Sequence, residues 1–186
     1  QMCIRDRDII PRMIDEVCVM AHRFEDVHGN DEPYWRDVGT IDAYYDANLD
    51  LCNVEPMFNL YDHDWSTYTL WHNDPPAKTV FAGDDGRKAE VVDSLLCPGA
   101  VVSGAQIRRS ILSNRVRVED HAQLDGTVAF SGVRIGPRCK IRKTILDKWI
   151  EVPGGTEIGF DREADEARGL TVTPSGITVV PPGHQF

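Results

Sequence analysis

Residues 135–147 read IGPRCKIRKTILD and contain the clearest repeat unit of the chain. Its aliphatic residues Ile135, Ile141 and Leu146 recur at intervals of five or six, with a Gly-Pro pair after the first of them. This spacing matches neither the period of an α-helix nor that of a hairpin strand. It is typical of a parallel β-helix, in which each short strand forms one side of a coil and points its aliphatic residue inward.

The same spacing extends in both directions from residue 135. Aliphatic or aromatic residues recur at Val102, Ile107, Leu112, Val118, Leu124, Phe130, Ile135, Ile141, Leu146, Val152 and Ile158. About ten such units predict roughly three coils if each coil takes three of them. A β-sandwich with irregular strands is the alternative, and the regularity of the spacing favours the β-helix.

The sequence after the repeats predicts two further elements. Residues 161–168, DREADEAR, favour a short helix. Residues 170–180, LTVTPSGITVV, predict a hairpin whose turn is Pro174-Ser175-Gly176. We therefore expect a β-helix domain over residues 91–186 that ends in a helix and a hairpin.

The first part of the chain has a different pattern. The opening QMCIRDR, residues 1–7, fits no element, and we exclude it from the fold as a scar or artefact. A short helical turn is expected from Pro11, and strands are expected at 17–24 and 34–38.

Gly39 ends the second of these strands, and Thr40 is a suitable N-cap for a helix over 41–52. Residues 53–90 are interpreted as a linker, with a short strand near 68–71 and a Pro75-Pro76 turn.

Charge is unevenly distributed in this acidic chain of net charge −10. Residues 101–150 hold ten Lys or Arg and four Asp or Glu, a net charge of +6, so the remaining residues carry −16. A basic segment in an acidic protein suggests a local anion site rather than affinity for nucleic acid or membranes. A solvated face crossed by ion pairs is the other interpretation.

The five cysteines are scattered, with no C-x-x-C pair among them. This pattern argues against a disulfide framework or a zinc site and favours the reducing cytoplasm. No apolar run approaches the roughly 18 residues that a membrane span requires.

Four motifs together carry a resemblance to a known family: YWRDVGT at 34–40, PPAK at 75–78, SNRVRV at 113–118 and the stretch at 135–147. In these motifs the chain resembles the C-terminal portion of bacterial glucose-1-phosphate adenylyltransferase (ADP-glucose pyrophosphorylase). The resemblance implies a mixed fold. Residues 8–52 would be the tail of an α/β nucleotidyltransferase domain, and a left-handed parallel β-helix would follow the linker.

The resemblance also implies a function. The family joins ATP and glucose 1-phosphate to give ADP-glucose and pyrophosphate for glycogen synthesis, with Mg²⁺ as cofactor, in a cytoplasmic homotetramer controlled by phosphorylated metabolites. The family's Gly-rich phosphate-binding loop has no counterpart here, because Gly83-Asp84-Asp85-Gly86 is only a turn. We therefore expect this chain to be a fragment that is inactive alone.

The resemblance also implies roles for individual residues, from the positions that they occupy in the family's pattern. Asp37 would be one carboxylate ligand of Mg²⁺, and Arg36 a contact to the substrate. Lys148, Arg115 and Arg117 would be anion contacts for effectors. Lys148 and Gly132 occupy positions where some relatives have an Arg and a Glu that touch a nucleotide inhibitor, and Gly132 departs from that pattern.

The residues alone leave other interpretations open. Asp37 could pair with Arg36 or anchor the N-terminus of the following helix, and Arg115 and Arg117 could be outward charges on alternate strand positions. The chain could also be a stand-alone β-helix module for effector binding or oligomerisation. A hexapeptide-repeat acyltransferase is a third possibility, in which His121, the one histidine of residues 101–150, would be the base.

Overall fold

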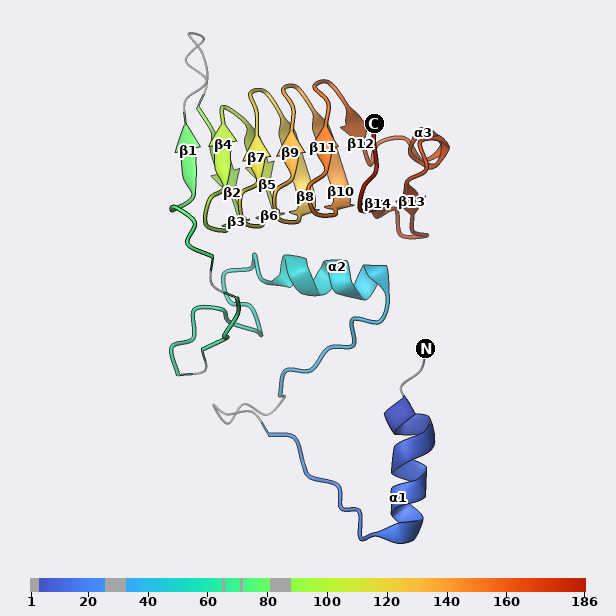
Figure 1. Cartoon of the computed structure of the whole chain (residues 1–186). Coiled ribbons are helices and arrows are strands. Elements are labelled where there is room, and N and C mark those ends of the chain that lie inside the picture. Colours follow the sequence, from blue (N-terminus) through green and yellow to red (C-terminus); the bar gives the residue numbers. More distant parts are fainter. Residues whose placement is uncertain (1–3, 26–32, 65, 71, 81–87) are drawn as a thin grey trace. The chain divides into compact units, whose positions relative to one another are not determined.

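The computed structural model describes residues 4–25, 33–64, 66–70, 72–80 and 88–186. The chain divides into two compact units, residues 1–35 and residues 36–186, and each is described by itself. Figure 1 shows the elements of both.

The first unit holds a helix but no strand among its described residues. A π-helical turn, η1 (Arg5–Ile9), runs into α1 (Ile10–Glu16), which has Pro11 in its first turn as predicted. Residues 5–7, which we expected to lie outside the fold, belong to this turn. The strand predicted at 17–24 is wrong, because these residues form no strand and pair with none in the described part of the chain.

The second unit is built around a parallel β-solenoid, which confirms the β-helix. One of its sheets has five parallel strands, in the order β1-β4-β7-β9-β11. Their bounds are β1 (Lys78–Val80), β4 (Val101–Ser103), β7 (Arg117–Val118), β9 (Arg134–Ile135) and β11 (Glu151–Val152). The predicted strand near 68–71 is absent from the described residues 68–70, and β1 forms inside the range expected to be linker.

The other two sides of each coil belong to a second sheet (Figure 1). Its parallel strands are β2 (Glu90–Val92), β3 (Leu95–Leu96), β5 (Gln106–Arg108), β6 (Ile111–Leu112), β8 (Gln123–Ala129), β10 (Lys140–Leu146) and β12 (Glu157–Ile158). Pairing partners such as Gln106, Gln123, Lys140 and Glu157 lie 17 residues apart. The solenoid has about four turns, so the predicted three coils were too few.

The core of the solenoid is a stack of aliphatic side chains. Ile107, Leu124, Ile141 and Ile158 pair in register, and each is almost fully buried. Since their neighbours on the same strands point to solvent, the strands show the alternation of a sheet with one wet face. Stacking coils buries this core, which one coil could not bury alone.

Each coil turns three corners, and each corner has a residue in the left-handed backbone region. The three columns of corner residues are Asp93, Arg109, Gly126 and Lys143; Gly99, Arg115, Gly132 and Trp149; and Gly104, His121, Arg138 and Gly155. In the first column each is followed by Ser or Thr. The hydroxyls of Ser94, Ser110 and Thr144 donate to the carbonyl oxygen two residues earlier, which satisfies a backbone acceptor at the corner.

Helix α2 (Ile41–Asp50) packs on one face of the solenoid. Thr40 caps it by accepting from the backbone N–H of Ala43, as predicted. Tyr45 of α2 is buried with Val128, Ile145 and Ile177 in a second apolar cluster outside the coil.

The prediction that residues 8–52 form the tail of an α/β nucleotidyltransferase domain is wrong, because that portion is not in this chain. Residues 34–38 form no strand, and no strand among the described residues pairs with them. The helix of this segment, α2, lies against β8 of the solenoid.

The C-terminal elements confirm the predictions. Helix α3 (Arg162–Ala167) is capped by Asp161, and β13 (Thr171–Val172) pairs antiparallel with β14 (Thr178–Val180). Strand β14 also pairs with β10, so the hairpin closes the last coil. None of the helices in the described part of the chain has the length and apolarity that a membrane span requires.

Candidate functional site

Asp37 lies on an exposed segment just before α2. Its Oδ1 accepts a hydrogen bond from the backbone N–H of Gly39 at 3.0 Å, which closes a local turn. Mg²⁺ usually takes one or two protein carboxylates together with substrate phosphates. The described residues contain no group of three or more His, Cys, Asp or Glu placed to bind a metal ion. One exposed carboxylate does not make such a centre, so the described residues do not form a Mg²⁺ site on their own.

Arg36 is held by α2 rather than by Asp37. Its guanidinium lies 3.7 Å from the carboxylate of Asp50 at the end of that helix. The alternative in which Asp37 pairs with Arg36 is not among the ion pairs of the described residues. Arg36 also lines a groove with Asp46, Arg109 and Lys143. Part of the Arg36 side chain therefore remains accessible to a ligand.

The three predicted anion contacts have different surroundings. Arg115 lies 2.6 Å from Asp74, whose side chain is only 5% exposed, so this arginine serves to fasten the segment before β1 to the solenoid. Arg117 is an exposed residue of β7, in register with Arg134 of β9. Lys148 is exposed and directly precedes Trp149, which lies two coils after Arg115 in the same column of corners.

Gly132 has a structural explanation. A Cβ added there would lie 2.1 Å from the ring of Trp149, the corner residue of the next coil. The backbone of Gly132 also has a positive φ of 76°. The indole therefore occupies the space that a side chain at position 132 would fill, and a glycine is required.

The docking of α2 depends on a close approach at Gly126. The hydroxyl of Tyr45 donates to the carbonyl oxygen of Gly126 at 2.6 Å, and the ring is 4% exposed. Burial raises the pKa of Tyr45 to about 12, since the phenolate would lose its water. At the start of the helix, Asp42 accepts hydrogen bonds from Thr173 and Ser175 of the terminal hairpin.

We expect Gly126→Ala to detach α2 from the solenoid. A Cβ at this position would lie 2.5 Å from the Tyr45 hydroxyl, and Gly126 has a φ of 60° that disfavours other residues. The loss of Tyr45 burial should destabilise the docked helix by about 2 kcal/mol. An alanine held at positive φ should add about 1 kcal/mol of backbone strain. Hydrogen exchange should show amides 41–50 losing protection.

Gly155→Ala is the matched control. Gly155 has a φ of 79°, and nothing lies within 4 Å of an added Cβ. Gly155→Ala should add only the backbone strain of an alanine at positive φ, and the amides of α2 should stay protected from hydrogen exchange. If both variants affect amides 41–50 equally, the contact at Gly126 does not hold the helix.

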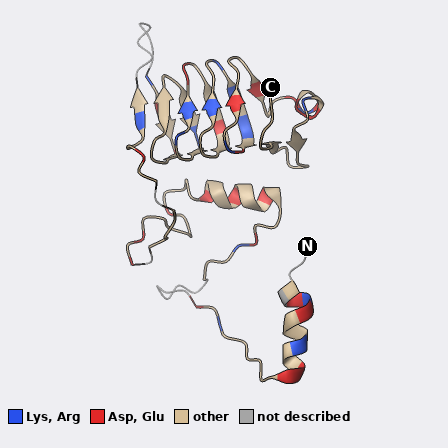
Figure 2. Ribbon diagram, viewed as in Figure 1, with Lys and Arg blue, Asp and Glu red and all other residues tan. Residues whose placement is uncertain are grey.

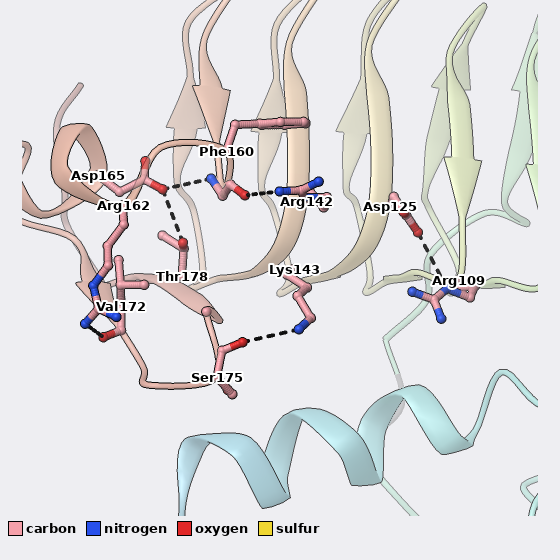
Figure 3. A pocket seen from close by; sticks show the side chains of 12 residues that line it. Arg109, Asp125, Arg142, Lys143, Phe160, Arg162, Asp165, Val172, Ser175 and Thr178 are labelled. Carbon is pink, nitrogen blue, oxygen red and sulfur yellow. Dashed lines mark hydrogen bonds and ion pairs between the residues drawn. The ribbon is translucent and has the colours of Figure 1, made fainter.

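Four cationic side chains that the sequence analysis did not single out line one cavity of about 480 Å³ (Figure 3). They come from three places: Arg109 from a corner, Arg142 and Lys143 from β10, and Arg162 from α3. Lys143 lies two coils after Arg109 in the same column of corners. Figure 2 shows basic residues along the solenoid strands, whereas α2 carries only acidic ones. The sequence signal is the recurrence of Arg108-Arg109-Ser110 as Arg142-Lys143-Thr144 two coils later.

Evidence for acyl-transfer or thiol chemistry is weak. His121 is a half-buried corner residue with a positive φ of 62°, a position that its place in the coil explains. Burial raises the pKa values of the Cys52, Cys97 and Cys139 thiols, which disfavours the reactive thiolate.

Comparison with known proteins agrees with the fold. The family model described as "GlmU-like, C-terminal hexapeptide" matches residues 75–180. The chain is 42% identical over 182 residues to a glucose-1-phosphate adenylyltransferase of Rhodopirellula baltica, and 46% identical over 173 residues to one of Koribacter versatilis. A Bifidobacterium longum enzyme of the same name is 50% identical over 151 residues.

These matches concern one part of each relative. They take in 97%, 93% and 81% of this chain, but 41%, 41% and 36% of the relatives. The chain thus spans about two fifths of the length of the curated relatives it matches, and it corresponds to their C-terminal portion.

Proposed function

The chain belongs to the GlmU-like C-terminal hexapeptide family, and from this premise we propose that it is the C-terminal portion of a glucose-1-phosphate adenylyltransferase. The observation that carries the proposal is the 42–50% identity to enzymes of that name. Two of these matches take in 97% and 93% of the chain, so they include α2 as well as the solenoid. The proposed reaction of the whole enzyme joins ATP and glucose 1-phosphate and releases pyrophosphate.

Further parts of the proposal follow from the same resemblance. The solenoid would wind left-handed, and the enzyme would be a cytoplasmic homotetramer regulated by phosphorylated metabolites. Arg36 would contact substrate, with Asp50 fixing its orientation. Lys148, Arg115 and Arg117 would serve effector anions, although Arg115 would first have to leave Asp74.

Asp37 is proposed to supply one carboxylate of a Mg²⁺ site whose other ligands come from outside this chain. Its Oδ1 is engaged by the Gly39 N–H, which orients the group and leaves Oδ2 available. When bound, the ion would offset charge on the transferring phosphoryl group.

The experiment that tests the proposed function compares two proteins. The 186-residue chain by itself should release no pyrophosphate from ATP and glucose 1-phosphate above a blank, because it has no Gly-rich phosphate loop. The full-length protein that contains it should release pyrophosphate and form ADP-glucose. Turnover by the short chain, or none by the long one with these substrates, would contradict the proposal.

A further inference from the structure

The first turn of α2 is tied to the turn of the C-terminal hairpin. The Asp42 carboxylate accepts hydrogen bonds from the hydroxyls of Thr173 and Ser175, which lie 131 and 133 residues further along the chain. We propose that Asp42 is a positioning residue of the enzyme, because this contact fixes α2 and thereby the place of the Arg36 guanidinium. The inference rests on the proposed function and gives the C-terminal hairpin a part in it.

The hairpin turn offers Asp42 donors that are themselves held in place. Thr173 is buried, and its hydroxyl accepts from the backbone N–H of Ile177 at 3.1 Å and lies 2.8 Å from the Ser175 hydroxyl. Lys143 of β10 donates to the Ser175 carbonyl oxygen at 3.2 Å, which ties the same turn to a coil (Figure 3). A carboxylate forms stronger hydrogen bonds with such donors than a neutral acceptor does.

Arg36 is connected to α2 at both ends of the helix. Between residue 36 and the helix lies a short turn, in which Asp37 accepts from the Gly39 N–H and Thr40 caps α2. The Arg36 guanidinium lies 3.7 Å from the carboxylate of Asp50, in the last turn of α2. The backbone hydrogen bonds of a helix make it stiff along its axis, so a displacement of the first turn is passed on to Arg36.

A carboxylate in the first turn also stabilises a helix without any partner, through the partial positive charge of the helix N-terminus. That role needs the charge of Asp42 but not the hydroxyls of the hairpin. Ser175→Ala separates the two roles. It removes a donor to Asp42 but keeps the charge of Asp42 and the backbone carbonyl oxygen that accepts from Lys143.

The kinetic test uses the full-length protein that contains this chain, with kcat and the KM values for ATP and for glucose 1-phosphate as readouts. Ser175→Ala should raise, by about fivefold, the same KM that Arg36→Gln raises, with kcat within about twofold, because a misplaced contact weakens ground state and transition state alike. Asp42→Ala should have the same effect. Asp42→Asn keeps an acceptor oxygen for the hydroxyls and should restore most of the affinity.

A double variant shows whether the effect passes through Arg36. In Arg36→Gln the guanidinium is already absent, so adding Ser175→Ala should change the KM by less than about twofold. A general loss of stability would act independently of Arg36, and the two effects on KM would then multiply.

Hydrogen exchange of the 186-residue chain follows the contact itself. Amides 43–45 should exchange about tenfold faster in Ser175→Ala, since a charge-assisted hydrogen bond no longer holds this turn of α2. Thr171→Ala is the matched control, because it removes an exposed hydroxyl from β13 of the same hairpin. It should leave amides 43–45 and both KM values within about twofold of the parent.

Two results would overturn the positioning role. One is an unchanged KM in Ser175→Ala, which would leave the contact as an attachment of the helix alone. The other is multiplication of the two effects in the double variant. A parent that releases no pyrophosphate would refute the proposed function and the positioning role together, whereas either of these results in a parent that turns over would refute the positioning role alone.

Discussion

Replacing Asp37 by asparagine in the full-length protein is expected to lower turnover by about two to three orders of magnitude with the fold intact. Asparagine keeps the side-chain oxygen that accepts from the Gly39 N–H, so the turn before α2 should persist. It loses the negative charge, which is what a hard cation such as Mg²⁺ takes from a carboxylate. The rate and the Mg²⁺ concentration for half-maximal rate would both be measured.

Asp50→Asn is the control from the same segment. It removes the ion pair with Arg36 but leaves Asp37 unchanged, so its Mg²⁺ requirement should match that of the unaltered protein. The unfolding midpoint of Asp37→Asn should lie close to that of the parent. A near-normal rate for Asp37→Asn would remove this residue from the proposed metal site and leave it as a turn-forming residue.

Asp165→Ala is expected to destabilise the cap that closes the solenoid by about 3 kcal/mol. The Asp165 carboxylate accepts from Arg168, from the backbone N–H of Gly159 and from the hydroxyl of Thr178, and thereby joins α3, the last coil and the hairpin. Alanine would leave the Gly159 N–H and the Thr178 hydroxyl without this acceptor and Arg168 without this carboxylate partner. This loss of stability lies at the low end of the range for a broken buried ion pair, because the side chain of Arg168 is 35% exposed.

Urea unfolding of the 186-residue chain would give this free energy, and hydrogen exchange of residues 171–180 would locate the loss. Glu163→Ala lies on the same helix but is exposed, so it should change stability by no more than about 0.5 kcal/mol. The free energy of unfolding of Asp165→Asn should lie between those of the two alanine variants, since asparagine retains one acceptor oxygen. Equal stability of Asp165→Ala and Glu163→Ala would show that the cap is held by apolar contacts alone.

Local and periodic signals explain what could be predicted about the fold. The aliphatic residues five or six apart marked the inward positions, and Ile107, Leu124, Ile141 and Ile158 are indeed stacked in the core. Thr40, the composition of residues 161–168 and the Pro174-Ser175-Gly176 turn marked two helices and a hairpin, because helix propensity, caps and turns depend on neighbours along the chain.

Strand predictions failed where pairing was required. Residues 17–24 and 34–38 have the composition of strands, but a strand forms only when another one accepts its hydrogen bonds. The number of coils was underestimated because β1 belongs to the solenoid although it lies within the predicted linker and is 23 residues before its partner in β4.

Some features of the candidate site could likewise be predicted from the sequence, and others could not. The sequence by itself determined the coil, its inward face and its basic character, since these follow from spacing and composition. Only the tertiary structure decided that Arg115 pairs with Asp74, 41 residues away, and that Tyr45 docks on Gly126, 81 residues away. It also brought Arg109 and Arg162 to one cavity. Stacking of coils sets which corners become neighbours, and no local signal encodes a contact that depends on the register of distant strands.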